Sequence, residues 1–138
     1  MRNEILILED NEERRTGFTA VLKELAPDCR ILFWNNARVM IDEFPPHLAN
    51  ARLISLDHDL NEVALAEDAR DGLLVAEFLA TQKPSSPVIV HSSNYERSLS
   101  MVNELTYGGW TVERIGPVCA DWITTLWQPV VAKLLSAK

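Results

Sequence analysis

The sequence predicts an α/β fold, a doubly wound sheet of five parallel strands in the order 2-1-3-4-5, formed by a single domain over residues 1–138. Apolar runs too short for helices alternate with longer segments of helical period, as in βαβ proteins. Two of these runs, residues 5–8 and 88–90, are apolar on both faces, which is typical of central parallel strands covered by helices. A hydrophobic content of 47% in 138 residues is enough for one core.

The first expected strand covers residues 4–8 and is followed by a helix over about residues 11–25. Asp10 or Asn11 is the expected cap of this helix, because both side chains accept hydrogen bonds from helical N–H groups. The acidic pair at residues 12–13 favours the same end of the helix, where the backbone dipole is positive. The chain therefore opens with a strand-to-helix unit.

The bounds of the other elements are predicted from proline, glycine and capping residues, which mark where helices begin and end. They are a strand over 30–34, a short helix capped by Asn36, a loop at Pro45-Pro46, a strand over 52–56, a helix from Asp71-Gly72 to a break at 83–87, a strand over 88–91, a helix over about 95–105 that ends at Gly108-Gly109, a strand over 110–114, and a helix over about 121–135 kinked at Pro129.

Charged and imidazole side chains follow three of the strands at their carboxyl ends. They are Glu9-Asp10 after the first strand, Asp57-His58-Asp59 after the third, and His91 in the fourth, with Ser92-Ser93-Asn94 behind it. Ligands of doubly wound sheets bind outside the carboxyl ends of the strands. Because these three strands are neighbours in the predicted order, we expect the side chains to share one crevice.

Such a crevice has the groups that phosphodiester cleavage needs, namely a base, an acid and donors for the phosphoryl oxygens. His58 and His91 are the candidate acid and base, since an imidazole with an ordinary pKa of about 6.5 suits both roles near neutral pH. Asp57 or Asp59 is expected to orient one ring. Ser92, Ser93 and Asn94 precede a helix, where side chains and amides receive phosphate oxygens.

A metal site is the alternative arrangement of the same carboxylates, which repel one another without a cation. Its ligands would be Glu9, Asp10, Asp57 and Asp59, with magnesium or manganese as the ion. Ligation by His58 or His91 would favour a transition metal instead. Purely structural roles also remain open, with Asp10 and Asn94 as helix caps and His91 as a core histidine.

Composition limits the classes of partner. The net charge is −7 and the 13 lysines and arginines are scattered, so nonspecific nucleic-acid binding is disfavoured. Apolar runs of four to six residues are too short to cross a membrane, and the first residues lead directly into a strand, so we expect a cytosolic protein. Trp122 and Trp127 of the final helical segment are candidates for a homodimer surface.

These strand-end residues resemble the response-regulator receiver family, which has a flavodoxin-like fold. Glu9-Asp10 resembles its acidic pair, Asp57 its phospho-accepting aspartate and Ser92 its strand-four hydroxyl, and Asp71-Gly72 also recurs. The resemblance implies magnesium at Asp10 and Asp57. Receivers also have a lysine at the end of strand five, where this chain has only Arg114 as a replacement.

A divergent branch, the cyclic-phosphate processing receiver domain, is similar in more detail. The similar motifs are Glu9-Asp10 with Arg14, Leu56-Asp57-His58-Asp59-Leu60, and His91-Ser92 with Asn94. The resemblance implies an enzyme that acts on a small-molecule cyclic phosphate or a cyclic nucleotide, and it makes Arg14 the preferred phosphate ligand, ahead of Arg114. The alternative is a non-enzymatic signalling receiver that is phosphorylated at Asp57, or a degenerate one that only binds a partner.

Overall fold

The computed structural model describes residues 2–58, 71–117 and 119–136. Its sheet has five parallel strands in the order β2-β1-β3-β4-β5, which confirms the predicted topology. The strands are β1 (Glu4–Leu8), β2 (Arg30–Trp34), β3 (Ala51–Leu56), β4 (Val88–His91) and β5 (Val112–Ile115). Asp59 and the acidic residues up to 70 lie outside the described part.

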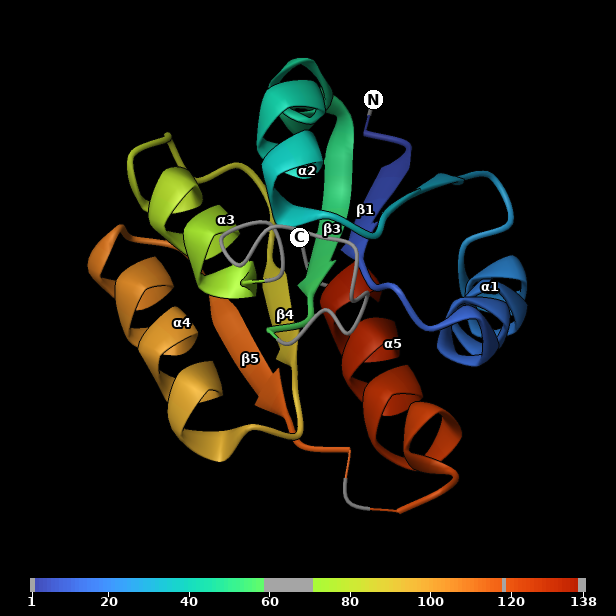
Figure 1. The fold of residues 1–138 in the computed structure, drawn as a ribbon. Helices are drawn as coiled ribbons and strands as arrows, with labels where there is room; N and C mark the ends of the chain where they lie inside the picture. Colours follow the sequence, from blue (N-terminus) through green and yellow to red (C-terminus); the bar gives the residue numbers. More distant parts are fainter. Residues whose placement is uncertain (1, 59–70, 118, 137–138) are drawn as a thin grey trace.

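Helices cover both faces of the sheet (Figure 1). They are α1 (Glu12–Leu25), α2 (Ala37–Glu43), the 3₁₀ helix η1 (Pro45–Asn50), α3 (Gly72–Ala80), α4 (Tyr95–Tyr107), the π-helical turn η3 (Ile123–Trp127) and α5 (Gln128–Ser136). Helices α2, α3 and α4 lie on one face, and α1 and α5 lie on the other. This is the doubly wound arrangement.

The side chains of β1 alternate between two separate hydrophobic cores. Leu6 and Leu8 belong to the core beneath α2, α3 and α4, whereas Ile5 and Ile7 belong to the core beneath α1 and α5. Successive side chains of a strand point to opposite faces, so one apolar run fills both cores. All four of these side chains are fully buried, as expected for a central strand.

Several element boundaries differ from those expected, and three of the differences lie at the starts of elements. Pro45-Pro46 begins the 3₁₀ helix η1 instead of a loop, because proline fits the first turn of a helix, where no N–H is needed. Strand β3 begins one residue earlier, at Ala51. Strand β5 begins at Val112, since Trp110 belongs to the turn after α4 and its amide donates to the Leu105 carbonyl at 2.9 Å.

The final helical segment is divided rather than simply kinked. The π-helical turn η3 ends at Trp127, with the amide of Gln128 bonded to the carbonyl of Ile123, and α5 then carries Pro129 in its first turn. Proline has no N–H and its ring collides with the carbonyl four residues earlier in a regular α-helix. The wider turn before Pro129 relieves that conflict.

The expectation that Trp122 and Trp127 form a dimer surface is wrong. Their exposed fractions are 5% and 0%, and both rings pack on Phe18 inside the chain. Within the described residues, no helix is long and apolar enough to cross a membrane.

Candidate functional site

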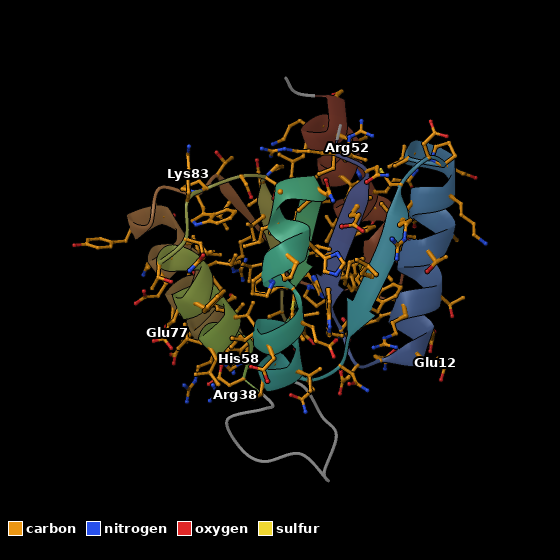
Figure 2. The ribbon with its side chains drawn as sticks, turned by 90° about the horizontal axis from the view of Figure 1, so that it is seen from above. Glu12, Arg38, Arg52, His58, Glu77 and Lys83 are labelled. Atoms are coloured by element: carbon orange, nitrogen blue, oxygen red, sulfur yellow. The ribbon has the colours of Figure 1, made fainter. Side chains whose placement is uncertain are left out.

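The register of the sheet brings the predicted site residues to one edge. Leu8 is level with Leu56 in β3, and Leu56 is level with Val90 in β4, so the residues that follow the three strands emerge side by side. Figure 2 shows His58 at the end of the molecule where α1 begins with Glu12, opposite the end that carries Arg52. The described residues that follow β1, β3 and β4 therefore lie at one edge of the sheet, as expected for neighbouring parallel strands.

Glu9 is a fully buried carboxylate with donors on both oxygens. Its Oε1 lies 3.0 Å from Nε2 of His91, and its Oε2 accepts the amide of Asn11 at 3.1 Å. Burial by itself raises the pKa of Glu9, but the hydrogen-bonding and electrostatic interactions with His91, the amide of Asn11 and the charge of Arg14 outweigh it, so the pKa lies below its ordinary value. Glu9 is thus a fixed negative charge inside the protein.

Asp57 lies next to that charge and is itself 3% exposed. Its Oδ1 accepts the amide of His58 at 2.8 Å. Burial and the charge of Glu9 raise the pKa of Asp57 to about 8, although the Arg14 guanidinium and the His58 amide oppose the shift. The positive charge of Arg14 therefore offsets only part of the cost of burying Asp57 beside Glu9.

Three carboxylates and one guanidinium form the centre of the site. One oxygen from each of Glu9, Asp10 and Asp57 lies within 4.8 Å of the others, a spacing suited to a shared cation. We call these three residues the acidic cluster. The Nη1 atom of Arg14 lies 3.8 Å from Glu9 Oε1 and 3.9 Å from Asp57 Oδ2. The Arg14 guanidinium also packs over the Trp122 ring, 5.6 Å from its centroid, which fixes its approach from α1.

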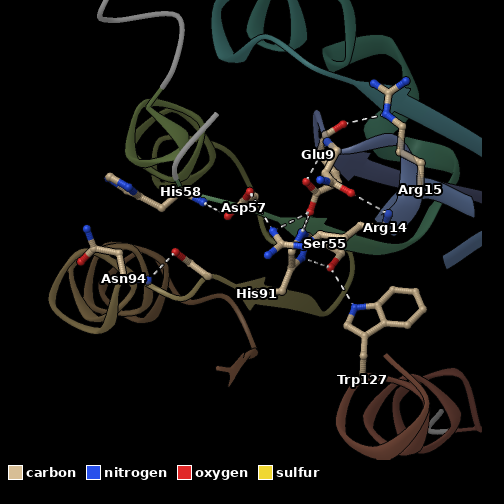
Figure 3. A network of polar contacts seen from close by, with 11 residues as sticks. Glu9, Arg14, Arg15, Ser55, Asp57, His58, His91, Asn94 and Trp127 are labelled. Carbon is tan, nitrogen blue, oxygen red and sulfur yellow. Dashed lines mark hydrogen bonds and ion pairs between the residues drawn. The ribbon is translucent and has the colours of Figure 1, made fainter. Parts of the chain in front are cut away.

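His58 and His91 have different partners and lie on different sides of Asp57 in Figure 3. Nε2 of His58 is 2.9 Å from Oδ1 of Asp71, and its ring is directed away from Asp57. The same Asp71 oxygen accepts the amide of Leu73 and so caps α3. The joint use of both histidines as acid and base stays a prediction.

His91 is enclosed in the core beneath α1 and α5. Its exposed fraction is 0%, and its ring lies 5.1 Å from the Phe18 ring and 6.0 Å from the Trp122 ring, measured between centroids. Its Nδ1 lies 2.7 Å from Oγ of Ser55 and its Nε2 contacts Glu9. Both ring nitrogens are therefore occupied by protein groups.

The residues after β4 surround the start of α4. Ser92 is 1% exposed and its Oγ accepts the amide of Asn94 at 3.2 Å. Asn94 caps α4 through the amide of Arg97, while Ser93 is exposed. The Ser92 hydroxyl is therefore buried at the start of α4, whereas the Ser93 side chain is not.

Arg114 does not contact the acidic cluster within the described residues. Its Nε donates to Oγ of Ser98 at 2.8 Å, and its guanidinium lies over the Tyr95 ring, 4.6 Å from the centroid. The cation that approaches Asp57 thus comes from α1 rather than from β5.

Gly72 lets the start of α3 contact the backbone of the site. Its amide donates to the His58 carbonyl at 2.8 Å. A Cβ atom at this position would overlap the carbonyl oxygen of Asp57 and lie 3.0 Å from Cα of His58. The Asp71-Gly72 pair therefore combines an orienting carboxylate with the residue that permits its close approach.

Replacing Gly72 with alanine is expected to lower the free energy of unfolding by about 2–4 kcal/mol, because the backbone at Asp57 must shift. Gly17→Ala is the matched control: its Cβ would lie 2.8 Å from Cδ1 of Ile123, the end of a flexible side chain, and the helix gains from alanine. Urea denaturation of both variants tests this. Equal stability of Gly72→Ala and wild type would contradict the close approach.

Three contributors were not predicted as site residues: Ser55, Trp127 and Asp71. Ser55 is the one hydroxyl residue in the run Leu53–Leu56 and is fully buried, which is a detectable signal because buried polar groups need partners. Asp71 was expected at a helix start and as part of the Asp-Gly pair that resembles receivers, but not as a site residue. Nothing in the local sequence distinguishes Trp127 from other apolar positions.

Solved structures of receiver domains share this fold. A response regulator receiver domain from Rhodospirillum rubrum has a TM-score of 0.72 at 12% identity, over 98% of this chain and 95% of that chain. The response regulator domain of CheB from Thermotoga maritima has a TM-score of 0.67 at 12% identity, over 100% and 99%. The receiver domain of RcsB from Salmonella enterica serovar Typhimurium, solved with phosphomimetic BeF₃⁻, has a TM-score of 0.67 at 16% identity, over 96% and 90%.

These structural similarities show the fold, which is the flavodoxin-like receiver fold. The sequence profile of the cyclic-phosphate processing receiver domain matches residues 5–107, from the second residue of β1 to the end of α4, and so includes the whole acidic cluster. The chain belongs to the cyclic-phosphate processing receiver domain family. No curated protein matches it.

Proposed function

We propose that this protein is a phosphoesterase that hydrolyses a cyclic phosphate or a nucleotide phosphodiester at the carboxyl edge of its sheet. The observation that carries the proposal is the Arg14 guanidinium, which lies within 3.9 Å of both Glu9 and Asp57. An acidic cluster with a cationic side chain at its edge suits a metal-bound phosphate. Membership of the family supports a cyclic or esterified phosphate as the substrate class. The enzyme would act on this substrate in the cytosol.

The donor set fits a divalent cation. Glu9, Asp10 and Asp57 would hold it, and their oxygen atoms suit magnesium or manganese better than a histidine-ligated transition metal. When bound, such an ion polarises a phosphoryl oxygen and lowers the pKa of a bound water. A cation would also relieve the unfavourable burial that raises the pKa of Asp57 to about 8.

The residues around the cluster supply the remaining functions. Arg14 binds a phosphoryl oxygen, and Ser92 donates its hydroxyl proton to another, since its Oγ already accepts the amide of Asn94. His58 transfers the proton between the attacking water and the leaving oxygen, with Asp71 at 2.9 Å holding its ring. His91, which is enclosed, holds Glu9 instead.

The direct test is incubation with a panel of cyclic nucleoside monophosphates, with magnesium, manganese or EDTA. Ring opening to a monoester is expected with either ion and not with EDTA, and phosphorus NMR distinguishes the two species. If the cyclic esters stay intact under all conditions, the proposal is wrong for this substrate class.

Arg14→Ala is expected to lower kcat/KM by about 100-fold, because a charge-assisted contact to the phosphoryl oxygens is lost. Arg114→Ala is expected to change it less than about threefold, since Arg114 is bound to Ser98 and Tyr95. Steady-state kinetics of the two variants measure this difference. Equal losses would show that Arg114 also reaches the substrate.

A signalling receiver that accepts a phosphoryl group on Asp57 is the second candidate, favoured by the receiver fold and by the buried position of Asp57 at the end of β3. The position of Arg114, away from the acidic cluster, argues against it. Incubation with acetyl phosphate and magnesium distinguishes the two. A stable mass increment that disappears in Asp57→Asn supports the receiver, and its absence together with ester hydrolysis supports the enzyme.

A further inference from the structure

Four fully buried polar side chains form a hydrogen-bonded series, which we call the relay. Nε1 of Trp127 donates to Oγ of Ser55 at 3.2 Å, Oγ of Ser55 lies 2.7 Å from Nδ1 of His91, and Nε2 of His91 lies 3.0 Å from Oε1 of Glu9. Each side chain has an exposed fraction of 0%. The relay connects the π-helical turn η3 to the acidic cluster (Figure 3).

Only one assignment of donors and acceptors in the relay gives every polar hydrogen atom an acceptor. An indole N–H can only donate, whereas a serine hydroxyl has one proton and two acceptor positions. If Nδ1 of His91 carried a proton, Ser55 Oγ would accept twice, and its own proton would have no acceptor among its hydrogen bonds in the described residues. Ser55 therefore donates to Nδ1, and His91 carries its proton on Nε2.

This assignment determines what His91 presents to Glu9. With the proton on Nε2, the imidazole donates to Oε1 of Glu9, and the amide of Asn11 donates to Oε2 at 3.1 Å. A buried carboxylate with a donor on each oxygen keeps both its charge and its orientation. Its neighbours in the acidic cluster are Asp10 and Asp57.

We propose that Ser55 and Trp127 are positioning residues that hold His91 as its Nε2–H tautomer, so that His91 fixes the Glu9 carboxylate for a divalent cation shared with Asp10 and Asp57. The inference rests on the proposed function for the identity of the ion. Metal-bound groups commonly depend on such outer partners, whose loss weakens binding by about 10- to 100-fold.

The π-helical turn explains how Trp127 reaches this position. Trp127 is the last residue of η3, and the Gln128 amide skips to the carbonyl of Ile123. Each residue of an α-helix rotates by about 100°, so the extra residue in the turn changes which side chain faces the sheet. The Trp127 ring packs on Phe18 with 4.3 Å between centroids, which holds the indole N–H toward Ser55.

The tautomer can be measured in the metal-free, full-length wild type. Nitrogen NMR of histidine-labelled protein distinguishes Nε2–H from Nδ1–H and from the doubly protonated ring, and His91→Gln assigns the signal. The expected result at neutral pH is the Nε2–H tautomer. Either of the other two forms would overturn the proposal.

Two variants break the relay, and each has a matched control. Ser55→Ala removes the donor to His91, and Trp127→Phe removes the indole N–H together with part of the ring. Ser98→Ala and Trp110→Phe are the controls, since they remove a buried hydroxyl and a buried indole donor elsewhere, at Tyr95 and Leu79.

Ser55→Ala is expected to shift His91 toward the Nδ1–H tautomer and to weaken magnesium or manganese binding about tenfold. Trp127→Phe is expected to weaken metal binding about threefold. Isothermal titration calorimetry measures both affinities. The controls should leave the tautomer and affinity unchanged. Unchanged values in both relay variants, equal losses in the controls, or a wild type that binds neither ion would each refute the proposal. Failure of the proposed function alone would appear differently, as metal binding and the Nε2–H tautomer without ester hydrolysis.

Discussion

His58→Ala is expected to lower turnover of a cyclic nucleoside monophosphate by about 10²- to 10⁴-fold, the usual contribution of a positioned acid or base. Its melting temperature should fall less than that of His91→Ala, because the His58 ring, although only 5% exposed, lies beside Asp71 and has no buried charge that depends on it. Affinity for magnesium should also be kept, since the Glu9, Asp10 and Asp57 oxygens are untouched.

His91→Ala is expected to behave differently. It removes the partner of the buried Glu9 charge and leaves a cavity beside Phe18, so the free energy of unfolding should fall by about 3–5 kcal/mol. The milder His91→Gln, which retains a donor, should recover part of this loss.

His47→Ala is the control for activity, because His47 binds Glu4, the first residue of β1, at the opposite end of that strand from the acidic cluster. Steady-state kinetics, calorimetric metal titration and thermal melting of the three alanine variants separate the roles. Equal stability with equal loss of turnover in His58→Ala and His91→Ala would instead support their joint action as acid and base.

Asp57→Asn is expected to stabilise the metal-free protein by about 2 kcal/mol at pH 8, or about 5 °C in melting temperature. The amide keeps an oxygen for the His58 amide but removes the buried carboxylate next to Glu9. The same substitution should abolish stabilisation by magnesium and any metal-dependent turnover. Asp28→Asn, at an exposed position, is the control.

The pH dependence of this effect has a definite sign. Burial raises the pKa of Asp57 to about 8, whereas an unfolded aspartate has a pKa of about 3.9. Between these values the folded protein holds a proton that the unfolded chain has lost, so this group makes stability fall as pH rises. Calorimetry from pH 5 to 8.5 in EDTA should show that contribution in wild type and not in Asp57→Asn. The same slope in both proteins would contradict it.

The strand ends were predictable because they depend on local pattern. Glu9, Asp57 and His91 each terminate an apolar run, and parallel strands place such termini along one edge. The bounds of β1, β2 and β4 agree with the expected ranges for the same reason. Arg14 was also expected at the site, through the family resemblance.

The orientation of the side chains was not predictable, because it depends on partners distant in sequence. His58 contacts Asp71, and His91 is held by Ser55, which in turn accepts a hydrogen bond from Trp127. Trp127 lies 72 positions after Ser55 in the sequence. Arg114 has the chemistry of a phosphate ligand, yet Ser98 and Tyr95 hold it elsewhere. A strand-end pattern gives the position of a functional group and not the direction in which it points.

The separation of the two cores by the sheet has a consequence for how this site varies. Glu9 and His91 are held from the α1 and α5 side, whereas α3, on the other face, begins at the Asp71 cap that contacts His58. Random substitutions in the core beneath α1 and α5 should therefore mainly change which ion the protein requires. Substitutions around α3 should mainly change the catalytic rate. A laboratory evolution experiment would then tune the two properties independently, one face of the sheet at a time.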